Sequence, residues 1–392
     1  MASNSPGGRE HAFLLCAIGA DATDAKPITL HRLIDAGLDW NRLLARARRH
    51  RVAPLLVDPL NALVPERVPA DIRSLLSRKH RGTLRRGVHL TGQLVSILNR
   101  FEAAGVRSLP FKGPTLNALA YADLGLRQSI DLDILVAQAD IQAATLALVE
   151  LGFSPRLQVD ATRDKAFFEF ENAMAFRRTS DGCLVELHWA LTPKYLPFLA
   201  DPGQVWNSVT VAYPAGRAIT TLAPEPLLLF LCVHGAKHSW ESLCWVADIA
   251  RLITRQPTLR WEQLLSDAAA GGSLRMLCVG LLLARNLFSV TLPEPVNQML
   301  ASDPKGGAIA HTLAEALAGE DAPVMSYPAR VLFHLQMRER TADKFRFLQH
   351  LALTPTVRDY ELFRLPKPLT ILYPPMRAVR LVLDYAGQGR RP

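Results

Sequence analysis

The feature that most constrains the fold is a short segment in which carboxylates alternate with branched apolar side chains. Residues 130–136 are Ile-Asp-Leu-Asp-Ile-Leu-Val. Apolar residues at every second position predict a β-strand with one buried face, and they place Asp131 and Asp133 together on the other face. Side chains on one face of a strand lie about 6.5 to 7 Å apart, so two carboxylates there can converge on divalent cations. The chain is therefore predicted to contain a sheet with an acidic face.

A glycine turn precedes this strand. Residues 106–111 are predicted to form a short strand, Lys112-Gly113-Pro114 interrupts it, and residues 115–120 can begin a helix. Glycine lets backbone N–H groups approach an anion closely, and a helix N-terminus attracts phosphate. The two aspartates alone fit equally well a pair of solvated acids on an exposed sheet face. The glycine turn favours a site for phosphate and metal instead.

A third acid belongs to a later strand. Residues 167–177 and 183–189 are predicted to be two strands joined by a turn at Asp181-Gly182. In the second strand, alternation puts Glu186 and His188 on the face opposite Val185. A solvated surface glutamate is the commoner outcome for such a residue. Its position after the two aspartates is what favours a shared site.

The order of these motifs resembles the uncharacterised nucleotidyltransferase family, a divergent branch of the polymerase-β-like nucleotidyltransferases. The motifs are Lys112-Gly113, Asp131-x-Asp133 and residues 185–189, Val-Glu-Leu-His-Trp. The resemblance implies that Asp131, Asp133 and Glu186 are catalytic and bind two Mg²⁺ ions, and that Lys112 and Gly113 hold the phosphates of a nucleoside triphosphate. It implies transfer of a nucleoside monophosphate group, with release of pyrophosphate. The acceptor, a small molecule, peptide or saccharide, is not identified by any residue.

The sequence departs from the wider superfamily at one point. Pro114 follows Gly113, so the serine expected after the glycine is missing, and Lys112 would supply a cationic contact in its place. The resemblance covers most of the chain, including residues 40–56, 234–252 and 366–380. Two alternative functions are a nucleotide-binding pseudoenzyme or accessory protein, which the missing serine favours, and an RNA-modifying nucleotidyltransferase.

Other polar residues are candidates for the same site. Arg127 lies just before the acidic strand, where it can bind a phosphate oxygen or pair with Asp131. His234 and His238 have the i, i+4 spacing that places two imidazoles on one helix face. A metal site there is one interpretation; the other is that both pack or line the cleft, with Lys237 between them contacting phosphate.

A sequence of 392 residues, 49% hydrophobic and 21% charged, is long enough for several domains. We expect an α+β fold with an N-terminal helical segment (residues 1–83), a nucleotidyltransferase core with a small mixed β-sheet and helices (84–192), and a largely α-helical C-terminal domain (193–392). A long amphipathic helix is predicted to open the core at residues 84–101.

The composition also indicates the cellular compartment of the protein and the kinds of partner that it can bind. The five cysteines have no C-x-x-C spacing, and no apolar run is long enough to span a membrane, so a cytoplasmic protein is expected. The formal charge of +9 is compatible with nucleic acid, an anionic surface or nucleotide phosphates as partners. Because the excess is modest and spread along the chain, nucleic acid is a possible partner but not the favoured one. Arg42, Arg46, Arg48, Arg49 and Arg51 cluster on a predicted helix, where they form either a nucleic-acid contact or a solvated helix face.

Overall fold

The computed structural model describes residues 8–19, 25–156, 171–319, 325–354, 372, 375–377 and 379–380. It contains a five-stranded sheet in the order β1-β2-β5-β4-β3. The strands are β1 (Ser108–Pro110), β2 (Asp131–Val136), β3 (Phe153–Pro155), β4 (Ala173–Arg178) and β5 (Leu184–His188). β2 and β5 are parallel and the other neighbours antiparallel. Helices make up most of the remainder, so the predicted α+β class is confirmed.

The strands agree with the sequence pattern where alternation is strong. β2 and β5 lie within the segments predicted for them, whereas β1 is shorter than residues 106–111. The strand predicted over 167–177 is described only from residue 171, because 167–170 lie outside the described residues, and β4 begins at Ala173.

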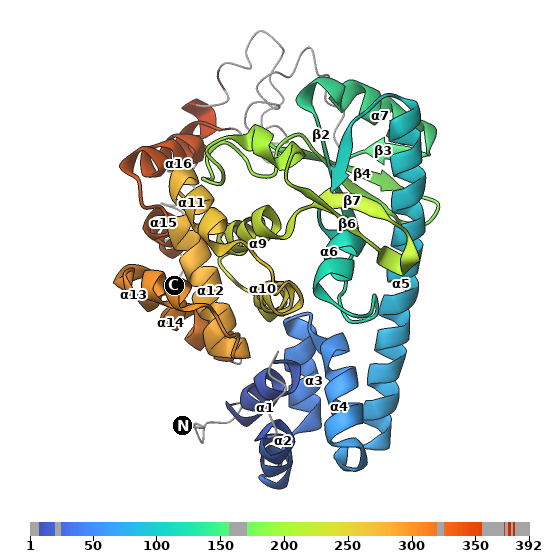
Figure 1. The fold of residues 1–392 in the computed structure, drawn as a ribbon, viewed down its shortest axis with the longest axis vertical. Coiled ribbons are helices and arrows are strands. Elements are labelled where there is room, and N and C mark those ends of the chain that lie inside the picture. The colour runs from blue at the N-terminus through green and yellow to red at the C-terminus, as the bar shows by residue number, and fades with distance from the viewer. Residues whose placement is uncertain are drawn as a thin grey trace.

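One face of the sheet forms an apolar core with two helices. Leu132 and Ile134 of β2 and Val185 and Leu187 of β5 are buried in one cluster with side chains of α5 (Ala70–Ala103) and α7 (Ile141–Glu150). In Figure 1 these two helices lie side by side along one edge of the molecule. The alternating carboxylates are therefore directed to the opposite face, as predicted.

Helix α5 is longer than predicted, because it begins at Ala70 rather than at residue 84. Of its side chains before residue 84, only those of Ile72 and Leu76 are buried. This half therefore has too few apolar positions to show an amphipathic pattern in the sequence. The helix is continuous across residue 83, where the N-terminal segment was expected to end. The helical segment and the sheet are thus joined by a rigid element.

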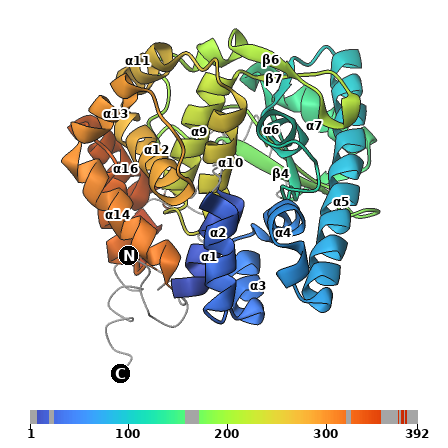
Figure 2. The ribbon, with the colours of Figure 1, turned by 60° about the horizontal axis from the view of Figure 1, so that its bottom comes forward.

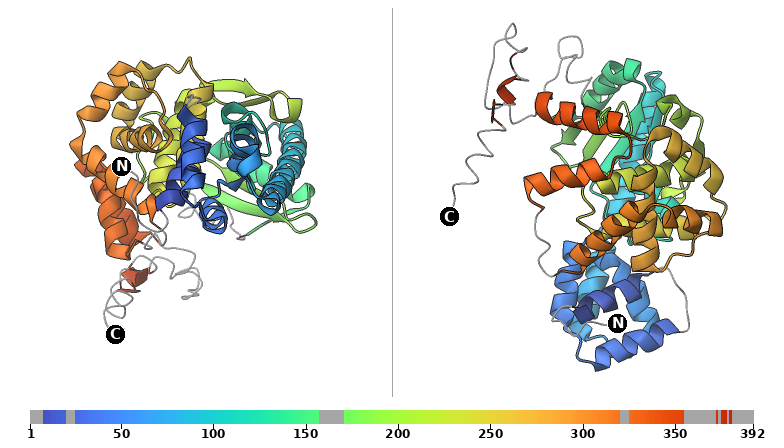
Figure 3. Two further views of the ribbon diagram at one scale, coloured as in Figure 1. Left: turned by 90° about the horizontal axis from the view of Figure 1, so that it is seen from below. Right: turned by 90° about the vertical axis from the view of Figure 1, so that its left-hand side faces the viewer.

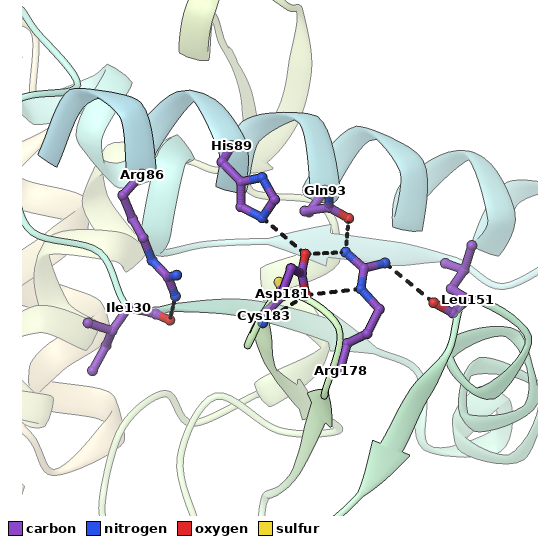
Figure 4. Close-up of polar contacts among 8 residues, drawn as sticks. All are labelled: Arg86, His89, Gln93, Ile130, Leu151, Arg178, Asp181 and Cys183. Carbon is purple, nitrogen blue, oxygen red and sulfur yellow. Dashed lines mark hydrogen bonds and ion pairs between the residues drawn. The ribbon is translucent and has the colours of Figure 1, made fainter. Parts of the chain in front are cut away.

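Polar contacts attach α5 to the sheet (Figure 4). Arg178 at the end of β4 donates to both carboxylate oxygens of Asp181, at 3.1 and 2.7 Å, and His89 of α5 lies 3.1 Å from the same carboxylate. Arg86, one turn earlier on α5, donates to the carbonyl of Ile130 at 2.9 Å, immediately before β2. The helix is therefore held against both the β4–β5 turn and the start of the acidic strand.

The N-terminal helices form a layer at one end of the molecule (Figures 1 and 3). They are α1 (Gly8–Ile18), α2 (Ala25–Asp35), α3 (Trp40–Arg49) and α4 (Val57–Leu63). Their buried apolar side chains belong to one cluster with those of the C-terminal helices. Figure 2, in which the N-terminal helices come forward, shows α1 next to the end of α12, and these two helices are in contact. The expected units 1–83 and 193–392 therefore share a hydrophobic core.

The chain after the sheet is largely helical, as predicted. Its helices are α9 (Pro224–Lys237), α10 (Leu243–Arg255), α11 (Trp261–Gly271), α12 (Leu274–Phe288), α13 (Glu294–Ala301), α14 (Pro304–Ala318), α15 (Tyr327–Gln336) and α16 (Thr341–Leu353). The sequence analysis missed a hairpin of β6 (Val209–Ala212) and β7 (Ile219–Leu222), which adjoins β1 through a 2.6 Å hydrogen bond from Thr221 to the carbonyl of Pro110. Among the described residues, no helix is both long and apolar enough to cross a membrane.

Candidate active site

The turn between β1 and helix α6 (Gly113–Ala120) requires glycine for two reasons. Gly113 has a φ of +56°, in the region that L-residues rarely adopt. A Cβ atom there would lie 3.0 Å from the carbonyl oxygen of Asp131, so the turn is pressed directly against the acidic strand. Pro114 is the second residue of α6, where its missing N–H leaves no bond unmade. The nearest hydroxyl, that of Thr115, is buried and donates to the carbonyl of Lys112.

The parallel pairing of β2 with β5 brings the predicted acids together. Asp133 lies opposite Glu186 in the register, and both line a single cavity with Asp131. Asp133, Glu186 and His188 each offer one ligand atom, and these atoms lie within 4.8 Å of one another. Asp131 is on the same face but outside this closest group. The sequence analysis did not assign His188, although its place two residues after Glu186 on a strand is a signal that could have found it.

Lys112 extends over this face and neutralises its most buried acid. Its Nζ lies 2.8 Å from Oδ1 of Asp133, and His188 Nε2 lies 3.3 Å from the same oxygen. Burial disfavours the carboxylate of Asp133, but the Lys112 ammonium and His188 together hold its pKa well below the usual range. Burial lowers the pKa of His188, but the carboxylates of Asp133 and Glu186, with oxygens 3.3 and 3.4 Å from its Nε2, outweigh burial and raise that pKa.

Asp131 is in a different electrostatic environment. It is half-buried, and burial together with the negative charge of Asp133 raises its pKa to about 6. Carboxylates this close compete for the charged state, and a bound cation would relieve the repulsion between them. Asp131 is therefore the acid of the pair whose charge depends most on what else occupies the cavity.

The donor set fits a divalent cation. Oδ2 of Asp133 is buried and accepts no hydrogen bond from any described residue. This carboxylate oxygen has no hydrogen-bond donor in the described part of the chain and lies beside the carboxylates of Asp131 and Glu186. A hard cation such as Mg²⁺ prefers oxygen ligands of this kind. The Lys112 ammonium already supplies one positive charge to this position.

The opposite wall of the cavity comes from α9 and α10. The cavity has a volume of about 570 Å³, and Phe230, His234, Lys237, His238 and Trp245 are among its lining residues. The His234 ring stacks on Phe230 at 5.6 Å between centroids, and His238 stacks on Trp245 at 5.3 Å. Burial lowers the pKa of both histidines, with the charge of Lys112 or Lys237 adding to the effect. Both line the cleft, and neither belongs to the group of possible metal ligands in the described part of the chain.

Arg127 does not pair with Asp131, one of the two partners considered for it. Its Nε and Nη2 donate to the two carboxylate oxygens of Asp248 on α10, at 2.8 and 3.0 Å. The hydroxyl of Tyr121 donates to the same carboxylate at 2.8 Å. No local pattern could have revealed Asp248, because it is 121 residues from Arg127 in the sequence. This pair joins the loop before β2 to the helical wall.

Comparison with known protein families identifies the family to which the chain is similar. The model of a family described as uncharacterised nucleotidyltransferase matches residues 36–289. The matched region contains every residue described above as lining the cavity, and it ends with α12. Searches of curated proteins and of solved structures each found no match.

Proposed function

Because this chain belongs to the uncharacterised nucleotidyltransferase family, we propose that it transfers a nucleoside monophosphate group from a nucleoside triphosphate to an acceptor, in a Mg²⁺-dependent reaction that releases pyrophosphate. The main support for this proposal is that the carboxylates of Asp131, Asp133 and Glu186 line one cavity beside the Gly113 turn.

The carboxylates of Asp131, Asp133 and Glu186 would hold two Mg²⁺ ions. When bound, such ions orient a triphosphate, lower the pKa of an attacking hydroxyl and stabilise the charge of a leaving pyrophosphate. His188 has a positioning role, because its Nε2 lies within 3.4 Å of both Asp133 and Glu186 and fixes how their carboxylates face the cavity.

The cations of the cleft would oppose the charge of the triphosphate. Lys112 is paired with Asp133, and its ammonium becomes available to a phosphate oxygen once another cation neutralises that carboxylate. Gly113 lets the backbone of the turn approach the phosphates. Lys237 faces the acids from the other wall, and Arg127 adds positive potential while it stays bound to Asp248.

Calorimetric titration of each nucleoside triphosphate with Mg²⁺ tests this proposal. We expect binding to one or more nucleotides, a loss of about tenfold or more in affinity for Asp131→Asn and Glu186→Gln, and little change for the control Glu150→Gln. Glu150 is an exposed carboxylate paired with Arg100 outside the cavity. These isosteric changes keep the volume of each side chain. Binding that is unaffected by either substitution in the cavity would remove the carboxylates from the metal site.

A second candidate is a nucleotide-binding pseudoenzyme. Two observations favour it: Pro114 replaces the serine of the wider superfamily, and Lys112 places an ammonium on Asp133. This candidate predicts nucleotide binding that needs Asp131 but no pyrophosphate release with any of a broad panel of hydroxyl and amine acceptors. Release of pyrophosphate with one acceptor would exclude it.

The third candidate, an RNA-modifying transferase, relied on the arginine cluster of α3 as an RNA contact, and the structure gives that cluster another use. Arg46 is buried and donates to the carbonyl of Ala318 at 2.8 Å, and Arg49 donates to that of Gly319 at 3.1 Å. These two side chains are thus used in packing against α14. RNA binding that weakens steeply with salt would restore this candidate.

A further inference from the structure

Arg51, the second residue after helix α3, has an unusual backbone conformation for a residue with a β-carbon. Arg51 has a φ of +58°, and the flanking hydrogen bonds run from Arg51 N–H to the carbonyl of Arg48 and from Val52 N–H to that of Ala47. This is the Schellman pattern, in which glycine is the usual residue at the left-handed position. A β-carbon at this position costs free energy, and such outliers concentrate at functional sites.

The strained position directs the Arg51 side chain to the cleft. Its guanidinium carbon lies 5.3 Å from the centroid of the Trp245 ring. Trp245 belongs to α10, and both residues line the cavity that holds the three acids. The N-terminal helices thus contribute a cation to a site whose acids come from the sheet.

Arg51 is a free cation among those of the cleft. Lys112 is bound to Asp133 and Arg127 to Asp248, so each already has a buried counter-ion. Arg51 is exposed, and no carboxylate of the described residues lies within ion-pair distance of it. Its neighbours Arg46 and Arg49 on α3 are turned away to carbonyls near the end of α14. Within the arginine cluster, Arg46 and Arg49 therefore bond to backbone carbonyls, whereas Arg51 lines the cavity.

We propose that Arg51 binds a phosphate group of the nucleoside triphosphate, so that the N-terminal helices complete the nucleotide site. The inference rests on the proposed function. A guanidinium stacked on an aromatic ring keeps its N–H edges in the plane and available, and these edges match two oxygens of a phosphate. A lysine at the same position would carry the positive charge but would lack the two parallel N–H donors.

The backbone of Arg51 provides an unusually direct test. Arg51→Gly removes the guanidinium and places the preferred residue at the left-handed position, so the fold should be at least as stable as before. We expect the thermal midpoint of the free protein to stay equal or rise, while the dissociation constant for the tightest-binding nucleoside triphosphate with Mg²⁺ increases about tenfold. Arg51→Lys should lose part of this affinity. Inorganic tripolyphosphate, titrated in parallel, separates phosphate contact from contact with the base.

Arg48→Ala is the matched control, because Arg48 is an exposed arginine in the last turn of α3, three residues before Arg51. It should change neither the midpoint nor the affinity. An unchanged dissociation constant for Arg51→Gly would overturn the inference, and so would a loss of affinity matched by a lower thermal midpoint, which indicates a structural role. If the wild-type protein binds a nucleotide through Asp131 and Arg51→Gly binds it equally well, only the role of Arg51 fails. If no nucleotide binds the wild type, the proposed function fails with it.

Discussion

The guanidinium of Arg127 and the carboxylate of Asp248 face each other through two hydrogen bonds, of 2.8 and 3.0 Å, across the join between the sheet and the helical wall. Asp248 is buried, and Tyr121 donates to it as well. Burial opposes the charge of Arg127, but the Asp248 carboxylate outweighs burial and raises the pKa of the guanidinium, which therefore stays charged. The two walls of the cleft are thus fixed to each other by a charged pair rather than by apolar packing alone.

Breaking this pair should cost stability. Asp248→Asn leaves a guanidinium buried without a counter-ion, for which we expect a loss of about 3 to 5 kcal/mol in the free energy of unfolding. Chemical denaturation followed by circular dichroism measures it. Asp35→Asn is the control, because its partner Arg67 lies on the surface and an exposed pair contributes at most about 1 kcal/mol. Equal losses for the two variants would mean that the Arg127 pair has no special role.

Lys112 should compete with metal for Asp133. Lys112→Met removes the ammonium that lies 2.8 Å from Oδ1 of Asp133 and leaves that carboxylate without its main counter-charge. We expect Mn²⁺, used as a probe without nucleotide, to bind this variant at least tenfold more tightly than the wild type, and to raise its thermal midpoint more. The control is Lys237→Met, which removes a cleft cation from the other wall. Equal Mn²⁺ affinities for wild type and Lys112→Met would contradict a cation site at Asp133.

Gly113 should be needed for more than its backbone angle. Gly113→Ala and Gly182→Ala both force alanine into a left-handed backbone, at φ of +56° and +68°, which costs about 1 to 2 kcal/mol. Only at Gly113 would the new Cβ also approach a carbonyl at 3.0 Å, whereas nothing lies within 4 Å of the Cβ position at Gly182. Denaturation should therefore show a larger loss for Gly113→Ala. Nucleotide affinity should fall for that variant alone, since the carbonyl belongs to Asp131.

Acid should destabilise the N-terminal helices through two buried histidines. Burial, with the charge of Arg49 for His50 and of Arg46 for His11, lowers the pKa of each to about 4. The unfolded chain takes up these protons near pH 6.5 and the folded protein does not, so stability is complete above pH 6.5 and decreases as the pH falls toward 4. Each histidine contributes up to about 3 kcal/mol to this loss.

The measurement is the free energy of unfolding between pH 7.5 and pH 5. His50→Asn should flatten the curve, because asparagine offers an acceptor in place of Nδ1, which lies 3.4 Å from the Leu243 nitrogen, and cannot be protonated in this range. His311→Asn, at an exposed position on α14, should leave the curve unchanged. A wild-type curve that is flat over this interval would contradict the assignment.

The sequence predicted the acidic face well, for a physical reason. Strand alternation is a local property, so the positions of Asp131, Asp133 and Glu186 followed from their immediate neighbours, and the register of β2 with β5 brought them together. The partner of Arg127 could not be predicted, since it depends on how α10 packs against the sheet. The first half of α5 was missed because a helix that buries few side chains shows no apolar stripe.

The role of Arg51 was hidden for a related reason. Five arginines within ten residues have the same chemical pattern in the sequence, and only the packing of α3 against α14 and α10 distinguishes those that bond to carbonyls from the one that faces the cleft. What the residue types determine is therefore the chemistry of the sheet face. What the tertiary packing determines is which cations can reach it.

The 34 residues of α5 also have a geometrical consequence. A helix of this length is about 50 Å long, and each residue turns it by about 100°. Its first half packs against the N-terminal helices and its second half against the sheet. One residue inserted near Gly82, where nothing crowds the helix, would swing Arg51 away from the cleft by more than a quarter of a rotation. Seven inserted residues would nearly restore the angle, but they would displace Arg51 by about 10 Å along the helix axis. The number of residues in α5 thus determines where Arg51 lies relative to the acids of the sheet.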